Sequence, residues 1–166
     1  MSVLGIGVDM VQVERIQHSL DRFGERFMKR VFTEGEIAYC LSMKFPARHF
    51  AARFAAKEAV SKAFGTGVGK VMGWRDIDVH KKKSGEPFLV LHGGAKALAK
   101  ERAMKSAWIS LSHTEHHAVA MIVIEIVDSE EKIQAFLAAL EEMMSGGMVT
   151  LERVQVIEYR HAERKE

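Results

Sequence analysis

The segment from Ala47 to Phe64 is rich in alanine and phenylalanine and stops at a glycine, Gly65. This composition predicts a helix over residues 47–64, because glycine readily adopts the left-handed conformation that ends a helix. The following residues, Gly65-Thr66-Gly67-Val68-Gly69, predict a loop. Backbone amides in a glycine loop can approach phosphate oxygens closely. The helix and its loop are therefore the first candidate for a functional site.

Two elements are expected before this helix. Residues 3–8 are short, apolar and interrupted by glycine, which predicts a buried strand that ends at Asp9. From Val11 to about Val31 the apolar residues recur at helical spacing, and the basic residues lie largely between them. This pattern predicts an amphipathic helical region with a basic face, although a solvated helix face would look the same.

After the glycine loop the pattern changes to that of strands. Residues 74–80 and 87–91 predict a hairpin, with Ser84-Gly85 at the tip of its charged turn. The next predicted elements are a short helix and two strands, at 95–104, 108–112 and 118–127. Helices mixed with hairpins in this order predict an α+β fold with a mostly antiparallel sheet and packed helices.

The end of the chain predicts a strand-helix-strand extension. Asp128 and Glu131 resemble a capping box, and the helix that follows them should end at Gly146-Gly147 before a final strand. We expect a main domain over residues 1–125 and an extension over residues 126–166. The extension resembles half of a ferredoxin-like unit, so its apolar face should pack on the main domain.

The composition excludes several classes of protein. The chain has 166 residues, 24 Lys and Arg against 22 Asp and Glu, and a formal net charge of +2, which does not predict nonspecific nucleic-acid binding. Its one cysteine, Cys40, cannot form an internal disulfide, which suits a reducing compartment. No apolar run is long enough to span a bilayer. We expect a cytoplasmic protein that binds neither nucleic acid nor membrane.

The residues Phe54, Glu58 and Lys62 lie four apart and share one face of the predicted helix. A Glu and a Lys at this spacing usually form only a surface ion pair. Their position one turn before the glycine loop favours a phosphate-handling site instead. The loop is not a P-loop, because Val71 follows Lys70 where Ser or Thr is required, and no third glycine completes a dinucleotide fingerprint.

Magnesium fits the candidate ligands better than zinc does. The three histidines His113, His116 and His117 have neither an accompanying cysteine nor metalloprotease spacing. Asp9 and Glu58 are hard oxygen ligands, and Mg²⁺ typically takes one or two carboxylates together with substrate phosphates and water. Asp9 at the end of a strand could equally cap a helix.

Three segments in this order resemble the holo-acyl-carrier-protein synthase family. They are Gly5 to Asp9 with Glu14-Arg15-Ile16, then Arg53 to Gly67, then Ser110 to His113 with Ala118-Val119-Ala120. The resemblance spans about residues 1–125, and the middle segment, RFAAKEAVSKAFGTG, is long and specific. It implies the 4′-phosphopantetheinyl transferase fold and a magnesium-dependent enzyme. Such an enzyme moves 4′-phosphopantetheine from coenzyme A to a serine of apo-acyl carrier protein.

The resemblance also implies roles for individual residues. Asp9 and Glu58 would hold Mg²⁺ against the coenzyme A pyrophosphate, Lys62 would contact the same phosphates, and either Glu58 or a magnesium-bound water would take the serine proton. The nucleotide half of coenzyme A would lie against the residues Arg53, Gly65, Thr66, Gly67, Pro87, Ser112 and His113.

The family resemblance further implies a homotrimer with active sites between subunits. The basic region would then meet the acidic helix of the carrier protein, through the residues Arg15, Arg22, Arg26 and Arg30, with Phe27 or Phe54 as an apolar anchor. Two alternatives remain open from sequence: a broad-specificity transferase of secondary metabolism, and a non-catalytic nucleotide-binding or assembly module. The extension after residue 125 departs from the family pattern, and we expect it to extend the sheet or the trimer interface.

Overall fold

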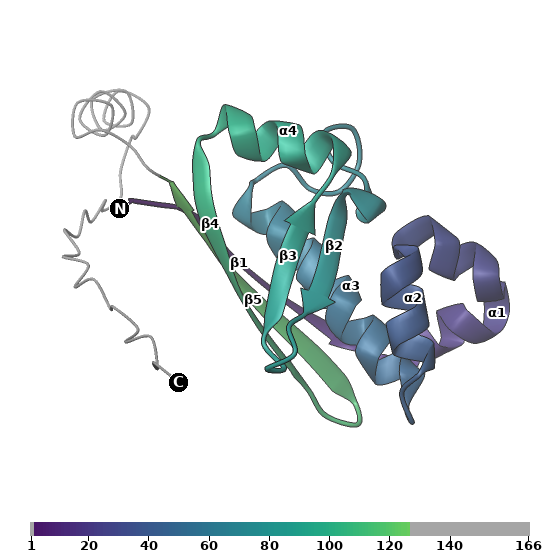
Figure 1. Ribbon diagram of the computed structural model, residues 1–166. Coiled ribbons are helices and arrows are strands. Elements are labelled where there is room, and N and C mark those ends of the chain that lie inside the picture. The colour runs from purple at the N-terminus through teal and green to yellow at the C-terminus, as the bar shows by residue number, and fades with distance from the viewer. Residues whose placement is uncertain (1, 127–166) are drawn as a thin grey trace, which may run out of the picture. The chain divides into compact units, whose positions relative to one another are not determined.

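The computed structural model describes residues 2–126, which form one compact unit. A three-stranded antiparallel sheet has the order β1-β5-β4, in which β1 is Ser2–Gln12, β5 is His117–Ile126 and β4 is Met104–His113. The long helix α3 (Pro46–Ala63) packs across β1 and β5 (Figure 1). This arrangement confirms the predicted α+β fold with antiparallel strands. The predicted strand-helix-strand extension lies outside the described residues.

Only one face of the sheet is covered by α3. On the covered face of the central strand, Ala118, Ala120, Ile122 and Ile124 are buried. The opposite face exposes a patch of large apolar side chains, here called the apolar sheet face, which consists of Ile6, Val8, Met10, Trp108 and Met121. The prediction of a buried strand over residues 3–8 was therefore wrong for one face of the strand, since alternate side chains of β1 point away from the helix.

Two glycines of β1 allow the strand to lie directly against α3. A Cβ atom on Gly5 would overlap the carbonyl oxygen of Ala63, and a Cβ atom on Gly7 would overlap that of Ala59. The helix presents small side chains to the strand, and Ala55, Ala59 and Ala63 are all buried. Glycine on the strand and alanine on the helix thus explain the close packing of these two elements.

Helices α1 and α2 lie at one end of α3 (Figure 1). Helix α1 (Val13–Val31) confirms the predicted helical region, but it is kinked at Gly24, which has a φ of 50°. Helix α2 (Glu34–Leu41) was not predicted from sequence. Its start is a capping box, in which Thr33 Oγ1 accepts a hydrogen bond from the Glu36 amide and Glu36 Oε2 accepts one from the Thr33 amide.

The predicted hairpin is confirmed, with strands β2 (Ile77–Lys81) and β3 (Pro87–Leu91) paired antiparallel. A single 3₁₀ turn, η1 (Trp74–Asp76), precedes it in place of the predicted start of the strand. Helix α4 (Gly93–Glu101) follows the hairpin and packs against β3 and β4. Within residues 2–126, none of the helices combines the length and the hydropathy needed to cross a bilayer.

Candidate functional site

Asp9 on β1 and Lys62 on α3 form an ion pair near the end of the helix. Lys62 Nζ donates to Asp9 Oδ1 at 2.7 Å and to the Val8 carbonyl oxygen at 3.2 Å. Glu58 lies one helical turn before Lys62 on the same face. The structure therefore brings Asp9, Glu58 and Lys62 together, although Asp9 and Lys62 are 53 positions apart along the chain. They meet where Gly5 and Gly7 allow β1 to lie directly against α3.

The charges in this cluster influence one another. Burial raises the pKa of the Glu58 carboxyl, and the negative charge of Asp9 raises it further, while Lys62 opposes both effects. The hydrogen bond to Asp9 raises the pKa of Lys62. Two carboxylates that compete in this way are stabilised by added positive charge. The pair thus has the donor atoms and the electrostatics that suit a divalent cation.

A metal bound here would need ligands from outside this part of the protein. Among residues 2–126, no group of three or more His, Cys, Asp or Glu side chains is arranged to hold a metal ion. Two carboxylates are nevertheless the usual protein contribution to a Mg²⁺ site that is completed by water and substrate phosphates. The donor set of Asp9 and Glu58 therefore fits magnesium with a phosphate substrate better than a closed structural site.

The glycine loop continues directly from this cluster. Gly65 and Gly67 have φ values of 68° and 66°, and nothing lies within 4 Å of the position of a Cβ on either, so the backbone conformation rather than a close contact requires glycine there. The amides of Gly65 and Thr66 donate to the carbonyls of Lys62 and Ser61. These two amides thus close the helix, which leaves them less suited to phosphate binding than expected.

A second group of predicted residues meets elsewhere, in what we call the Arg53 cavity. This hollow of about 170 Å³ contains Arg53, Pro87 and His113. Its other lining residues are Tyr39, His49, Ala52, His80, Lys81, Gly85 and Leu111. This cavity is lined neither by the cluster of Asp9, Glu58 and Lys62 nor by the glycine loop. Ser112 is exposed and lies outside this lining.

Arg53 is held inside this cavity with 5% of its surface exposed. Its guanidinium lies 4.1 Å from the centre of the Tyr39 ring, and Nη1 donates to the His49 carbonyl oxygen at 3.5 Å. Its Nε is buried and has no hydrogen-bond partner among residues 2–126. A buried cation with an unpaired donor is costly. Arg53 also lines the cavity, where its positive charge would suit an anionic ligand.

Several residues of the Arg53 cavity were missed from sequence. His49 lies four residues before Arg53 on α3, and its ring centre is 5.0 Å from that of His113. Burial lowers the pKa of His49, and the charges of His113 and Arg53 lower it further. His49 could have been predicted from its spacing, because it lies four residues before Arg53 and therefore on the same face of the helix. Tyr39 could not have been found, because its helix α2 was not predicted.

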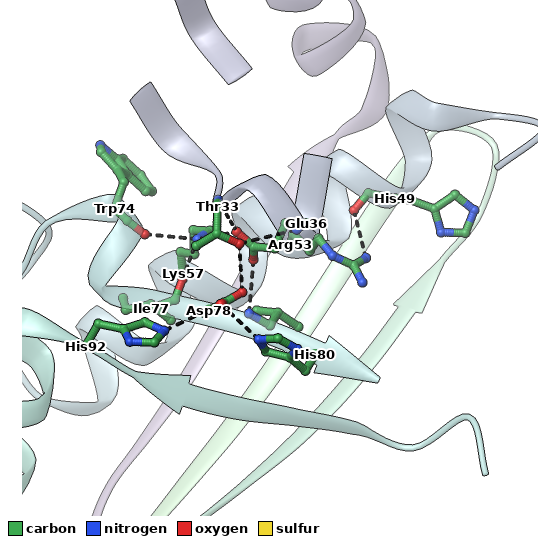
Figure 2. Close-up of polar contacts among 11 residues, drawn as sticks. Thr33, Glu36, His49, Arg53, Lys57, Trp74, Ile77, Asp78, His80 and His92 are labelled. Carbon is green, nitrogen blue, oxygen red and sulfur yellow. Dashed lines mark hydrogen bonds and ion pairs between the residues drawn. The ribbon is translucent and has the colours of Figure 1, made fainter. Parts of the chain in front are cut away.

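Lys57 precedes Glu58 in the chain but points into the core. It is fully buried and pairs with the buried Glu36 at 2.8 Å, while its Nζ also donates to the carbonyls of Trp74 and Ile77 (Figure 2). Burial lowers the pKa of Lys57, and Glu36 partly offsets this effect. Lys57 therefore ties α2 and the start of β2 to α3, which positions the walls around Arg53.

Four predicted carrier-binding residues line one further hollow, of about 420 Å³, here called the α1 groove. It contains Arg26, Phe27, Arg30 and Phe54, together with Phe23, Val31 and Trp74. Phe54 stacks on Trp74 with ring centres 4.8 Å apart. Arg15 and Arg22 are exposed on α1 before the kink and lie outside the groove. The groove thus combines an aromatic floor with two arginines.

Comparisons with known proteins found both sequence relatives and structural neighbours of this chain. Residues 5–122 match the model of the 4′-phosphopantetheinyl transferase superfamily. A holo-[acyl-carrier-protein] synthase of Koribacter versatilis is 46% identical over 123 residues, which cover 74% of this chain and 98% of that protein. A second family model, described only as "Uncharacterized ACR", matches residues 95–156, which run beyond the described part.

Solved structures give the same result. The crystal structure of holo-[acyl-carrier-protein] synthase from Neisseria meningitidis has a TM-score of 0.70 and 31% identity, and the match covers 75% of this chain and 99% of that one. The Helicobacter pylori synthase in complex with coenzyme A has a TM-score of 0.65 and 32% identity, with 72% and 99% covered. The fold of residues 2–126 and the order of its elements thus have close counterparts.

Proposed function

Because this chain belongs to the holo-[acyl-carrier-protein] synthase family of the 4′-phosphopantetheinyl transferase superfamily, we propose that it transfers 4′-phosphopantetheine from coenzyme A to a serine of an apo-acyl carrier protein. The observation that carries this proposal is the meeting of Asp9, Glu58 and Lys62 at the contact of β1 with α3. The match to nearly full-length synthases favours this transferase over a non-catalytic binding module.

Mg²⁺ is the metal that Asp9 and Glu58 would hold, and it would supply positive charge to the coenzyme A pyrophosphate. Lys62 contributes a further positive charge beside these carboxylates. In the transfer, the serine oxygen of the carrier forms a bond to the phosphorus that bears pantetheine. The bond from that phosphorus to the adenosine bisphosphate breaks, and the bisphosphate leaves with the electron pair. Neutralisation of charge by such groups supplies most of the catalysis in phosphoryl transfer.

Glu58 is suited to receive the proton of the carrier serine. Its carboxylate lies in the same cluster as Asp9 and Lys62, so it could take the proton directly or through a metal-bound water. Lys62 would then stabilise the charge on the leaving bisphosphate. In these roles Asp9 supplies negative charge and helps to position the metal. Glu58 does the same and also takes part in proton transfer.

The Arg53 cavity is the part of the protein that suits the nucleotide half of coenzyme A. It carries the cationic Arg53 and Lys81 and the imidazoles of His49, His80 and His113. It shares no lining residue with the Asp9 cluster, which supports an active site completed by two subunits. The apolar sheet face, with Val8 and Met121 paired across β1 and β5, is the surface that supports a homotrimer.

The α1 groove is the docking surface that we assign to the carrier protein. Arg26 and Arg30 would meet acidic side chains of the carrier, and Phe27 and Phe54 would hold an apolar side chain. Arg15 and Arg22 extend the positive charge along α1. We place this reaction in the cytoplasm, where a single buried thiol such as Cys40 remains reduced.

Incubation with apo-carrier protein, coenzyme A and Mg²⁺ tests this function. The expected result, by intact-mass spectrometry, is that the carrier gains the mass of one phosphopantetheine. Addition of excess EDTA should stop the reaction, and Mg²⁺ should restore it. A carrier of unchanged mass would contradict the transferase, whereas transfer that continues in EDTA would contradict only the magnesium site.

A further inference from the structure

Trp74 lines the α1 groove but was given no role from the sequence. Its ring stacks on Phe54, with an angle of 29° between the ring planes. Trp74 begins η1, a single 3₁₀ turn, and residues 65–73 before it contain no helix or strand. So short a turn does not fix its own position. The place of Trp74 in the groove therefore depends on tertiary contacts.

Lys57 is the buried residue that holds the backbone of Trp74. Its Nζ donates to the Trp74 carbonyl oxygen at 2.9 Å and also to the Ile77 carbonyl oxygen (Figure 2). Lys57 lies three residues after Phe54 on α3, so this helix contacts Trp74 twice, through the Phe54 ring and through the Lys57 side chain. The two contacts together determine where the indole lies in the groove.

Lys57 also contacts the aromatic residue behind Phe27. Its Nζ lies 5.7 Å from the centre of the Phe32 ring, which is fully buried. Phe32 in turn meets Phe27 edge to face, with ring centres 5.9 Å apart, and Phe27 lines the groove. Lys57 therefore supports the aromatic floor of the α1 groove from inside the protein, directly at Trp74 and through Phe32 at Phe27.

Glu36 of α2 holds Lys57 in this position. Its Oε2 lies 2.8 Å from Lys57 Nζ, and both side chains are buried. Glu36 Oε1 accepts a hydrogen bond from the Val79 amide and Oε2 accepts one from the Thr33 amide, so the carboxylate is itself fixed. An apolar pair of similar size often gives the same stability as a buried ion pair. Such a pair could not bind the Trp74 carbonyl, so the geometry is what the charged pair contributes.

We infer that Lys57, held by Glu36, is a positioning residue for carrier recognition, and that it acts by fixing Trp74 in the α1 groove. This inference rests on the proposed function, which assigns the groove to the carrier protein. Lys57 lines neither the groove nor the Arg53 cavity, so it touches no substrate itself. Trp74 lines the groove but not the cavity. The effect of Lys57 therefore falls on the carrier protein rather than on coenzyme A.

Fluorescence of Trp74 tests the positioning without any substrate. The chain has two tryptophans, so Trp108→Phe leaves Trp74 as the only one. In this background, Lys57→Met is combined with Glu36→Gln so that no buried carboxylate loses its partner. The emission of Trp74 should move to longer wavelength, and acrylamide should quench it more strongly, because the indole is less well held. Glu36→Gln alone is the matched control, since it keeps the amine that donates to Trp74, and it should change neither signal.

Transfer kinetics with Trp108 in place test the consequence for the carrier protein. The combined Lys57 and Glu36 variant should raise the KM for the carrier about fivefold, which corresponds to one lost hydrogen bond, with kcat and the KM for coenzyme A within about twofold of wild type. Trp74→Ala should raise the KM for the carrier by at least as much. Adding the Lys57 and Glu36 changes to Trp74→Ala should raise it no further, because both act through one residue.

Each other outcome overturns a stated part of the inference. An equal rise in the KM for the carrier and for coenzyme A would show that Lys57 only supports the fold, including the position of Tyr39 in the Arg53 cavity. An unchanged KM for the carrier in Trp74→Ala, or a change in fluorescence without a change in this KM, would exclude the role in carrier recognition. Fluorescence needs no transfer, and the proposed function fails only if wild type transfers nothing from coenzyme A. Thermal unfolding checks that each variant is folded.

Discussion

Gly7 of β1 lies directly against the carbonyl oxygen of Ala59 on α3, so closely that no other side chain fits between strand and helix. Two residues further along the strand, Asp9 reaches Lys62, which lies three residues after Ala59 on the helix. The distance between the backbones therefore sets the distance between the charged groups. Packing by a glycine and an alanine is the physical origin of the candidate catalytic centre.

Gly7→Ala should therefore destabilise the protein. The added methyl group overlaps backbone, which cannot rotate away, and overpacking of this kind typically costs about 1–3 kcal/mol. Urea unfolding measures the change. Gly35→Ala is the matched control, because nothing lies within 4 Å of its Cβ position and it lies in helix α2. It should be neutral or slightly stabilising. Equal stability of the two variants would contradict the close contact.

Asp78 should make the stability depend on pH in the acid range. Burial raises its folded pKa, but hydrogen bonds from His80, Thr33 and His92 together lower it by more, so its carboxylate stabilises the fold above the unfolded pKa of about 4. That contribution is lost as the pH falls through the lower, folded pKa. Asp78→Asn should give a shallower fall in the free energy of unfolding between about pH 5 and 2. Asp21→Asn, on the exposed face of α1, is the control. Identical curves for Asp78→Asn and wild type would disprove the effect.

Charge reversal in the α1 groove should weaken carrier binding. Arg26→Glu and Arg30→Glu should each raise the KM for the carrier protein about tenfold at low salt, because a favourable ion pair becomes a repulsive one. Arg15→Glu should have a smaller effect in the same direction. Added salt should reduce these differences. Lys96→Glu, on the exposed side of α4, is the control. An unchanged KM for the carrier protein in the groove variants would exclude this surface as the carrier-binding site.

A charge on the apolar sheet face should prevent assembly. Val8 and Met121 lie opposite each other, 52% and 46% exposed, and Val8→Asp would place a carboxylate between them. Light scattering should show a trimer for wild type and a monomer for Val8→Asp. Phe45→Ser changes an exposed aromatic residue that is not part of the apolar sheet face and should leave the trimer intact. A monomeric wild type would contradict the proposed assembly.

The regular elements were largely predictable from sequence. Helix α1 shows helical periodicity, α3 combines an Ala- and Phe-rich composition with a glycine stop, and a charged turn with Ser84-Gly85 at its tip separates the hairpin strands. Helix α2 was missed because its defining signal, the Thr33 and Glu36 capping box, is short and lies next to a glycine. The exposed face of β1 was missed because its apolar residues look the same whether a helix or another chain covers them. An apolar sequence pattern indicates that a face is covered, but it does not indicate which element or partner chain covers it.

The candidate site was only partly predictable. Asp9, Glu58 and Lys62 were selected from spacing and family resemblance, and the β1 and α3 contact explains why they meet. The division of the nucleotide-binding residues could not be predicted. Arg53 lies on α3 and Gly65 lies just beyond its end, and their spacing does not reveal which other elements surround each. His80 was missed because its position depends on Asp78, and therefore on tertiary contacts.

The rate of transfer by Asp9→Asn and Glu58→Gln tests the central claim most directly. Both variants keep the size of the side chain and remove its charge, and Glu101→Gln on α4 is the matched control. At saturating coenzyme A, carrier protein and Mg²⁺, each of the first two should lower kcat at least about 100-fold while thermal unfolding stays near that of wild type. A folded Glu58→Gln variant that transfers phosphopantetheine at nearly the wild-type rate would contradict the assignment of this cluster as the catalytic centre.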